Sequence, residues 1–143
     1  MEQHILRLKN MYLKAPINRL MEPSIEIFPS KAIIKMKAQA QYFHGGNSLH
    51  GSIYFKMLDD AAFFAVHSYV EDVFVFTTTF TTHMKRPFIK GMIYSEGRLR
   101  DQNEKEFTAE SVLYTADGKE IGSGHGVFKK SKLKLADAMC YTS

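Results

Sequence analysis

The chain has 143 residues, 45% of them hydrophobic and 24% charged, which fits one compact domain with its own core and excludes a disordered or fibrous protein. A formal charge of +4 without any nucleic-acid-binding motif argues against a nucleic acid as partner. The single cysteine, Cys140, excludes an internal disulfide, and no apolar run reaches the ~20 residues that span a bilayer, so we expect a cytoplasmic protein without stable membrane insertion.

The first segment, residues 1–22, is predicted to be helical. Apolar side chains from Ile5 to Ala15 recur at helical spacing, and Pro16 interrupts the pattern, so a short amphipathic helix is expected before this proline. We expect it to pack on the surface of a single domain that spans residues 1–143.

Strand-like and helical patterns alternate in the next part of the chain. Residues 24–41 alternate loosely around Pro29, which predicts two strands or one bent edge strand. A Gly-rich loop follows, and residues 52–70 then contain no Gly or Pro and have good helix formers at their centre. They are predicted to form the longest helix of the chain.

After the long helix the hydrophobic period changes to two. Four strands rich in β-branched and aromatic residues are predicted, at 73–84, 92–101, 106–115 and 120–128. Asp117-Gly118 predicts a tight turn between the last two, and residues 103–105 can turn the preceding pair, so the run is predicted to be an antiparallel meander. The fold class is therefore α+β, with one apolar helix lying across a curved antiparallel sheet.

Two adjacent carboxylates on the long helix have different neighbours. Asp60 follows Lys56 by one helical turn, which predicts an ordinary ion pair. Asp59 stands between Phe55 and Phe63, so it should be partly desolvated, with a raised pKa that suits a general base or a nucleophile. A structural aspartate that accepts a hydrogen bond from a backbone amide is the alternative.

These residues resemble the signature of the PaaI-type thioesterases of the hotdog superfamily, in which His-Gly-Gly precedes a short apolar stretch and Asp-x-Ala. Here His50-Gly51-Ser52 stands nine residues before Asp59-Asp60-Ala61, and Arg86-Pro87 matches an Arg-Pro often seen after the first strand that follows the helix. The resemblance implies a hotdog fold, in which a curved antiparallel sheet wraps around one long central helix, with a short N-terminal helix added.

The resemblance also implies a function. It implies hydrolysis of an acyl-CoA or acyl-carrier thioester by a homodimer or a dimer of dimers, without a metal or other cofactor. Asp59 would be the catalytic acid residue, and the backbone amide of Gly51 would polarise the thioester carbonyl. His50 would help to hold the loop or the thioester, and His44 stands where the family usually carries the Asn that places the water or the carboxylate.

The spacing of Gly51 and Asp59 indicates that one subunit cannot complete such a site. Eight residues on one helix correspond to ~12 Å, too far for both groups to touch one carbonyl carbon. If two long helices pack antiparallel about a two-fold axis, Asp59 of one chain can approach the Gly51 end of the other.

Further residues are candidates for binding the substrate rather than for the chemistry. Basic side chains suit the phosphates of a coenzyme A moiety, aromatic ones an acyl group, and loop residues the thioester. The candidates are Asn47, Ser52, Phe55, Phe63, Lys85, Arg86 and Lys90. A second group of lysines lies in a basic C-terminal tail, residues 129–143, where a solvated surface is the plainer interpretation.

Three departures from the family pattern, at His44, Ser52 and Phe63, keep other functions open. The second hypothesis is an acyl-CoA-binding or regulatory hotdog protein without catalysis. The third is a hotdog dehydratase or hydratase, which ranks lower because the loop around the histidines contains no proline. No metal is expected, since the histidines form no HExxH-like pair.

Overall fold

The computed structural model describes residues 1–143 as three α-helices, two short 3-10 helices and six strands. The helices are α1 (Glu2–Lys14), α2 (Pro16–Met21) and α3 (Gly51–His67), and the 3-10 turns are η1 (Ala40–Tyr42) and η2 (Leu135–Asp137). The strands are β1 (Ser24–Phe28), β2 (Lys31–Lys37), β3 (Val73–Met84), β4 (Met92–Gln102), β5 (Glu106–Thr115) and β6 (Glu120–Lys134). Pro16 ends the first helix as predicted, and it also occupies the first turn of α2, where a proline costs no hydrogen bond.

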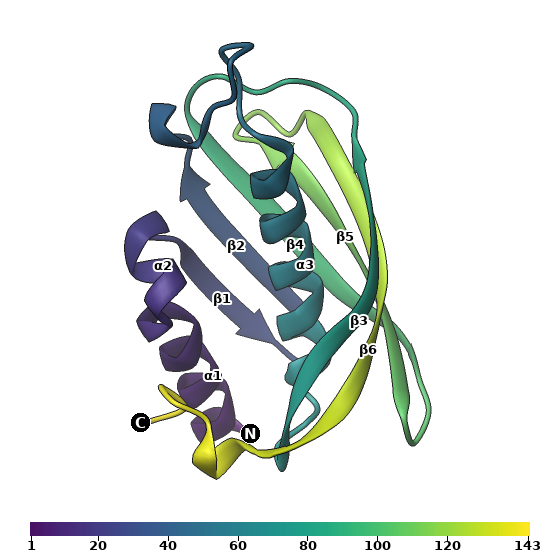
Figure 1. Cartoon of the computed structure of the whole chain (residues 1–143). Helices are drawn as coiled ribbons and strands as arrows, with labels where there is room; N and C mark the ends of the chain where they lie inside the picture. The colour runs from purple at the N-terminus through teal and green to yellow at the C-terminus, as the bar shows by residue number, and fades with distance from the viewer.

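All six strands form one antiparallel sheet in the order β1-β2-β4-β5-β6-β3. The sheet curves around α3, which lies along its concave face, while α1 and α2 stand beside β1 (Figure 1). This is the hotdog fold that the resemblance implied. Residues 24–41 resolve into two strands, because Pro29 and Ser30 form a turn between β1 and β2.

The prediction of a four-stranded meander is wrong at its first connection. Strands β4, β5 and β6 follow one another as predicted, but β3 pairs with β6 and β2 pairs with β4. The connection from β3 to β4 therefore crosses the end of the sheet past β5 and β6. As a result β3 is an edge strand of 12 residues whose outer edge is unpaired in the monomer.

Helix α3 is held very close to the sheet at its middle. A Cβ at Gly97 of β4 would lie 2.2 Å from the backbone of Ala61, so only glycine permits this approach. Two buried hydroxyls of the sheet fix the helix backbone just before the acidic pair: Ser95 donates to the carbonyl of Met57 and Ser111 to that of Leu58, each at 2.8 Å. These contacts place Asp59 relative to the sheet.

Two histidines, His4 and His67, form hydrogen bonds at the C-terminal end of α3. His67 is fully buried, and its ring accepts a hydrogen bond from the Val75 N–H at 3.1 Å while lying 3.0 Å from the Val70 carbonyl, so the proton sits on Nδ1. His4 of α1 lies 2.8 Å from the His67 carbonyl and 2.7 Å from the Tyr141 hydroxyl. The C-terminal segment therefore fastens α1 to the end of α3.

The lysines predicted to lie in a tail from residue 129 belong in part to strand β6, which continues to Lys134. Lys129 forms an ion pair with Glu106 and Lys130 with Asp72. The long β3–β6 ribbon extends past the end of α3 (Figure 1), and this extension explains why the strand outlasts its predicted end. None of the helices is both long enough and apolar enough to cross a membrane.

Candidate active site

Asp59 lines a cavity of about 300 Å³ between α3, the N-terminal helices and β3. Five of its eleven lining residues are aromatic, and Tyr12, Ile17 and Asn18 contribute the side formed by α1 and α2. The remaining lining residues are Lys56, Asp60, Phe63, Phe64, Phe74, Phe76 and Thr77. We call this the Asp59 cavity.

The carboxylate of Asp59 is partly withdrawn from water. Burial raises its pKa from 3.8 to about 6, against the hydrogen bond that Thr77 Oγ1 donates to Oδ1 at 2.7 Å. The neighbouring Asp60 adds a smaller raising effect and Lys56 a lowering one. The raised pKa predicted from the aromatic neighbours of Asp59 is therefore confirmed.

Asp60 has a structural role, as its spacing predicted. Its Oδ2 lies 2.6 Å from Lys56 Nζ and accepts a hydrogen bond from the Tyr12 hydroxyl at 2.9 Å. Burial and the neighbouring carboxylates hold the pKa of Tyr12 well above its ordinary value, so the phenol stays a donor. Asp60 thus ties α1 to α3 and leaves Asp59 as the acid whose second oxygen is free to act.

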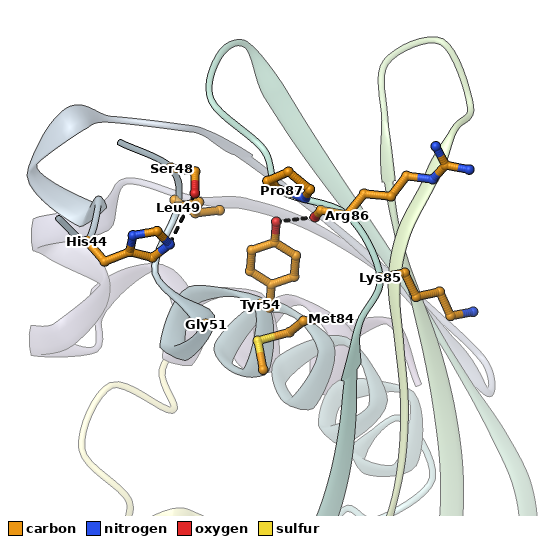
Figure 2. Close-up of a pocket in the computed structure, with 9 residues that line it drawn as sticks. All are labelled: His44, Ser48, Leu49, Gly51, Tyr54, Met84, Lys85, Arg86 and Pro87. Carbon is orange, nitrogen blue, oxygen red and sulfur yellow. Dashed lines mark hydrogen bonds between the residues drawn. The ribbon is translucent and has the colours of Figure 1, made fainter. Parts of the chain in front are cut away.

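A second cavity, of about 370 Å³, lies at the N-terminal end of α3 (Figure 2). We call it the Gly51 cavity. It is bounded by the loop before the helix and by the end of β3, and its lining residues are His44, Ser48, Leu49, Gly51, Tyr54, Met84, Lys85, Arg86 and Pro87. Gly51 and Asp59 therefore line different cavities of one chain, as the ~12 Å helical spacing requires.

The amide of Gly51 is an unused donor at the start of α3. The next amide, of Ser52, donates to His50 Nδ1 at 3.0 Å, and that of Ile53 donates to the His50 carbonyl, whereas the Gly51 N–H has no acceptor in the chain. The thioether of Met84 covers this glycine, since a Cβ at position 51 would lie 2.6 Å from Met84 Sδ. A free N–H at the positive end of a helix is suited to stabilising a developing oxyanion.

His44 is engaged within its own loop and cannot serve as a base for Ser48. Its Nδ1 accepts the Gly46 N–H at 2.9 Å, so the ring proton is on Nε2, which donates to Ser48 Oγ at 3.1 Å (Figure 2). A serine nucleophile would need the opposite tautomer. The pair therefore fixes the turn before the helix and forms no nucleophile–base dyad.

His50 and Ser52 lie outside both cavities. His50 caps α3 through its Nδ1, and together with Ser52 it borders a shallow hollow beside Tyr42 and Ile53 on another side of the helix start. The helix begins at Gly51, with His50 rather than Ser52 in the capping position. His50 therefore fixes the first turn of α3, next to the Gly51 amide.

Only some of the other predicted binding residues line one of the two cavities. Phe63 borders the Asp59 cavity, whereas Phe55, Asn47 and Lys90 border neither. Phe55 is 42% exposed and packs edge-on against Phe80 of β3, with ring centroids 5.7 Å apart.

Lys85 and Arg86 stand at the rim of the Gly51 cavity. Their side chains extend away from His44 (Figure 2), and Lys85 forms an ion pair with Glu120. The Arg86 carbonyl accepts a hydrogen bond from the Tyr54 hydroxyl, which fixes the rim to α3. Both cations can meet an anion only at the mouth of the cavity.

Thr77 is a partner of Asp59 that the sequence analysis missed. It lies in a run of β-branched residues that a strand explains without any chemistry, and it is 18 residues from the carboxylate to which it donates. Phe63 stands one turn after Asp59 on the helix, and the hydroxyl that meets this carboxylate comes from β3. No group of three or more His, Cys, Asp or Glu side chains comes together to hold a metal ion.

Solved structures share this fold closely. The PaaI protein of E. coli, from its phenylacetic acid degradation operon, superposes with a TM-score of 0.84 at 18% identity, over 93% of this chain and 96% of that one. A thioesterase family protein of Silicibacter pomeroyi superposes with a TM-score of 0.81 at 17% identity, over 88% of this chain and 96% of that one. No protein-family profile and no curated protein sequence matches the chain. At these identities the likeness establishes the hotdog fold, and the chemistry has to be argued from the residues.

Proposed function

We propose that the protein hydrolyses an acyl thioester, carried on coenzyme A or on a carrier protein, at a site shared by two subunits. The observation that carries the proposal is the half-buried carboxylate of Asp59, with a pKa of about 6 and one oxygen held by Thr77. Such a carboxylate is ionised at neutral pH and still basic enough to take a proton from water or to attack a carbonyl itself. The thioesterase-family neighbours support this class of reaction.

The second component of the mechanism is the Gly51 N–H, which in one chain has no acceptor. Attack on the thioester carbonyl puts negative charge on its oxygen, and a preorganised amide at a helix start stabilises that charge. The oxygen of the tetrahedral intermediate would accept this N–H, the thiol would leave with a proton, and the free carboxylic acid would be released.

A single two-fold axis can bring the two components together. Phe55 is midway between Gly51 and Asp59 on α3, so antiparallel helices that cross at Phe55 would set Asp59 of the partner subunit level with Gly51. On the free edge strand, antiparallel pairing centred between Phe80 and Thr81 would set Thr77 of the partner subunit opposite Met84. Phe55 and Phe80 touch each other in one chain, so one axis beside this contact serves both pairings.

The edge strand itself favours such an assembly. β3 has 12 residues and contains no proline, aspartate, glutamate, lysine or arginine, which leaves a long row of unpaired backbone groups ready to pair. Exposed apolar side chains accompany it, including Phe55, Phe76 and Met84. A second copy of the chain would cover this surface.

The test uses two variants that each break one component. Asp59→Asn removes the base and should lower turnover of an acyl-CoA panel by about a thousandfold without loss of folding, because the amide keeps the shape and removes a desolvated charge. Gly51→Pro removes the N–H, and the backbone suits a proline, since Gly51 is the first helical residue and His50 before it is extended at φ −62° and ψ 141°. Its Cβ would meet the flexible thioether of Met84, so Gly51→Ala, which adds the same Cβ but keeps the N–H, is its matched control. Asp72→Asn, on an exposed acid, is the control and should retain turnover.

Mixed dimers then separate a shared site from a site within one chain. A purified dimer of one Asp59→Asn chain and one Gly51→Pro chain would contain one site with both defects and one with neither, so about half of the wild-type turnover should return. Mixed dimers as inactive as both parents would contradict the shared site. A strictly monomeric wild-type protein would contradict it as well.

A thioester-binding protein without turnover is the second candidate. The observation that favours it is His44, whose two ring nitrogens are both engaged in its own loop and leave no donor to hold the water. In that case acyl-CoA would bind, no thiol would be released, and Asp59→Asn would leave binding unchanged.

A further inference from the structure

The end of the molecule around the Gly51 cavity carries most of the excess positive charge of the chain. Three segments meet there (Figure 1), and they comprise residues 37–50, 85–91 and 115–121. Together they contain five Lys or Arg side chains against two acidic ones, in a chain of formal charge +4. The cations are Lys37, Lys85, Arg86, Lys90 and Lys119. We call this surface the basic end.

Most of these cations have no acidic partner. The exception is Lys85, which forms an ion pair with Glu120. The four others are exposed and take part in no ion pair of the chain. Exposed and unpaired cations on three neighbouring segments produce a positive potential that attracts an acidic molecule.

The placement of the cations suits a protein better than a coenzyme A nucleotide. Three of the five border neither cavity, and Lys85 and Arg86 stand only at the rim, with their side chains directed away from His44 (Figure 2). A nucleotide carries its phosphates within one small group, so it would leave the cations of the other segments unmatched. A protein that presents several carboxylates on one face matches all three segments.

An exposed apolar side chain stands among these cations. Ile89 is 65% exposed, although the loop that carries it is anchored on both sides. Phe88 is buried and its carbonyl accepts the Leu49 N–H at 2.9 Å, and the Gly91 carbonyl accepts the Ala38 N–H at 2.9 Å. An apolar side chain surrounded by charged ones is the usual arrangement of a protein–protein contact.

We propose that the basic end docks a small acidic acyl carrier protein, which delivers its acyl thioester on a phosphopantetheine arm into the Gly51 cavity. Carboxylates of the carrier face the cations of the three segments, and an apolar side chain of the carrier contacts Ile89. The arm enters beside Arg86, so that the thioester carbonyl reaches the Gly51 N–H. The inference rests on the proposed function and chooses between the two carriers that this function leaves open.

The experiment presents one acyl group on three carriers. Hexanoyl groups on the acyl carrier protein of a bacterial type II fatty-acid synthase, on coenzyme A and on N-acetylcysteamine share the thioester and differ only in what carries it. The comparison is repeated with acetyl and dodecanoyl groups. Wild-type kcat/KM should be about tenfold higher for the carrier protein than for coenzyme A with the preferred acyl group. Salt should reduce this advantage, because it screens exposed charges.

Two variants each remove one component of the docking surface. Ile89→Asp replaces the apolar contact with an acid, and Lys37→Glu combined with Lys119→Glu reverses two cations that border neither cavity. Each variant should lower kcat/KM for the carrier-protein substrate about tenfold and leave that for the N-acetylcysteamine ester unchanged. All three side chains are exposed, so the substitutions should have little effect on stability.

A matched control separates docking from the overall charge of the protein. Lys132→Glu combined with Lys134→Glu changes the net charge by the same amount, on two exposed lysines at the opposite end of β6. This variant should keep the wild-type ratio of kcat/KM between the carrier-protein and coenzyme A substrates. A loss as large as that of the Lys37 and Lys119 variant would show that net charge, and not the basic end, is responsible.

The outcomes distinguish this inference from the function on which it rests. Equal kcat/KM for the carrier-protein and coenzyme A substrates with every acyl group would overturn the docking surface and leave the thioesterase intact. A preference for the carrier protein that survives both variants would do the same. No hydrolysis of any of the thioesters would overturn both proposals.

Discussion

The two ends of helix α3 are built in opposite ways. At the C-terminal end, His67 is fully buried, both of its ring nitrogens are hydrogen-bonded, and its carbonyl is met by His4. At the N-terminal end, the Gly51 N–H has no acceptor and borders an open cavity. The difference indicates that one end stabilises the fold, while the other leaves a backbone donor unpaired beside a cavity, as the proposed function requires.

The largest effect on stability is expected from a substitution of His67 at the C-terminal end of α3. His67→Leu fills a similar volume but leaves the Val75 N–H and the Val70 carbonyl unpaired, so the free energy of unfolding should fall by about 3–4 kcal/mol. Chemical denaturation measures this change in the free energy of unfolding. His125→Leu, on an exposed outward-facing histidine, is the control and should stay within about 0.5 kcal/mol of wild type.

Lowering the pH should reduce the stability that His67 contributes at this end of α3, within a defined pH range. Burial lowers the pKa of His67 from 6.5 to about 4, so the unfolded chain takes up a proton that the folded protein refuses. The stability from the neutral ring is present in full above pH 6.5 and is lost as the pH falls to about 4, a loss of about 3 kcal/mol.

A variant isolates that contribution from the other titrating groups. Asp59 acts in the opposite sense, because its raised pKa gives a stability contribution that is present below pH 3.8 and is lost as the pH rises through about 6. His67→Gln keeps a donor and an acceptor but does not titrate, so the gap between it and wild type should narrow from pH 6.5 to 4. A gap that stays constant over this range would show that His67 is not the group responsible.

A smaller effect, on turnover and its pH dependence, is expected from a substitution of Thr77, where β3 meets the middle of α3. Thr77→Val removes the hydrogen bond that lowers the pKa of Asp59, so this pKa should rise above about 6 and turnover should fall about tenfold. The pH profile of kcat/KM, which should rise through about pH 6 in wild type, should move to higher pH. Thr78→Val, whose hydroxyl bonds the Val127 carbonyl, should leave the profile in place.

The smallest effect is expected at the open end. Gly51→Ala keeps the N–H but places a methyl where the Met84 thioether lies, and this flexible side chain can move away. Stability should change by less than about 0.5 kcal/mol and turnover should fall about threefold. Met84→Ala in the same background should restore turnover, and a persistent loss in the double variant would rule out crowding by Met84 as the cause.

The features that could be predicted from the sequence depend on near neighbours along the chain. The limits of α3 and of most strands follow from periods of 3.6 and two, and the different surroundings of Asp59 and Asp60 follow from residues one turn away. The ion pair of Asp60 with Lys56 and the raised pKa of Asp59 were predictable for this reason.

Contacts between segments far apart in the sequence could be learned only from the folded chain. Strand pairing is non-local, so no periodicity could reveal that β3 joins β6 and leaves a free edge, or that Thr77 reaches Asp59 from it. The placement of Asn18 and Tyr12 at the Asp59 cavity likewise depends on how α1 and α2 pack against α3. The spacing of residues along a helix determines which side chains share a face, and tertiary packing determines which residues those side chains contact.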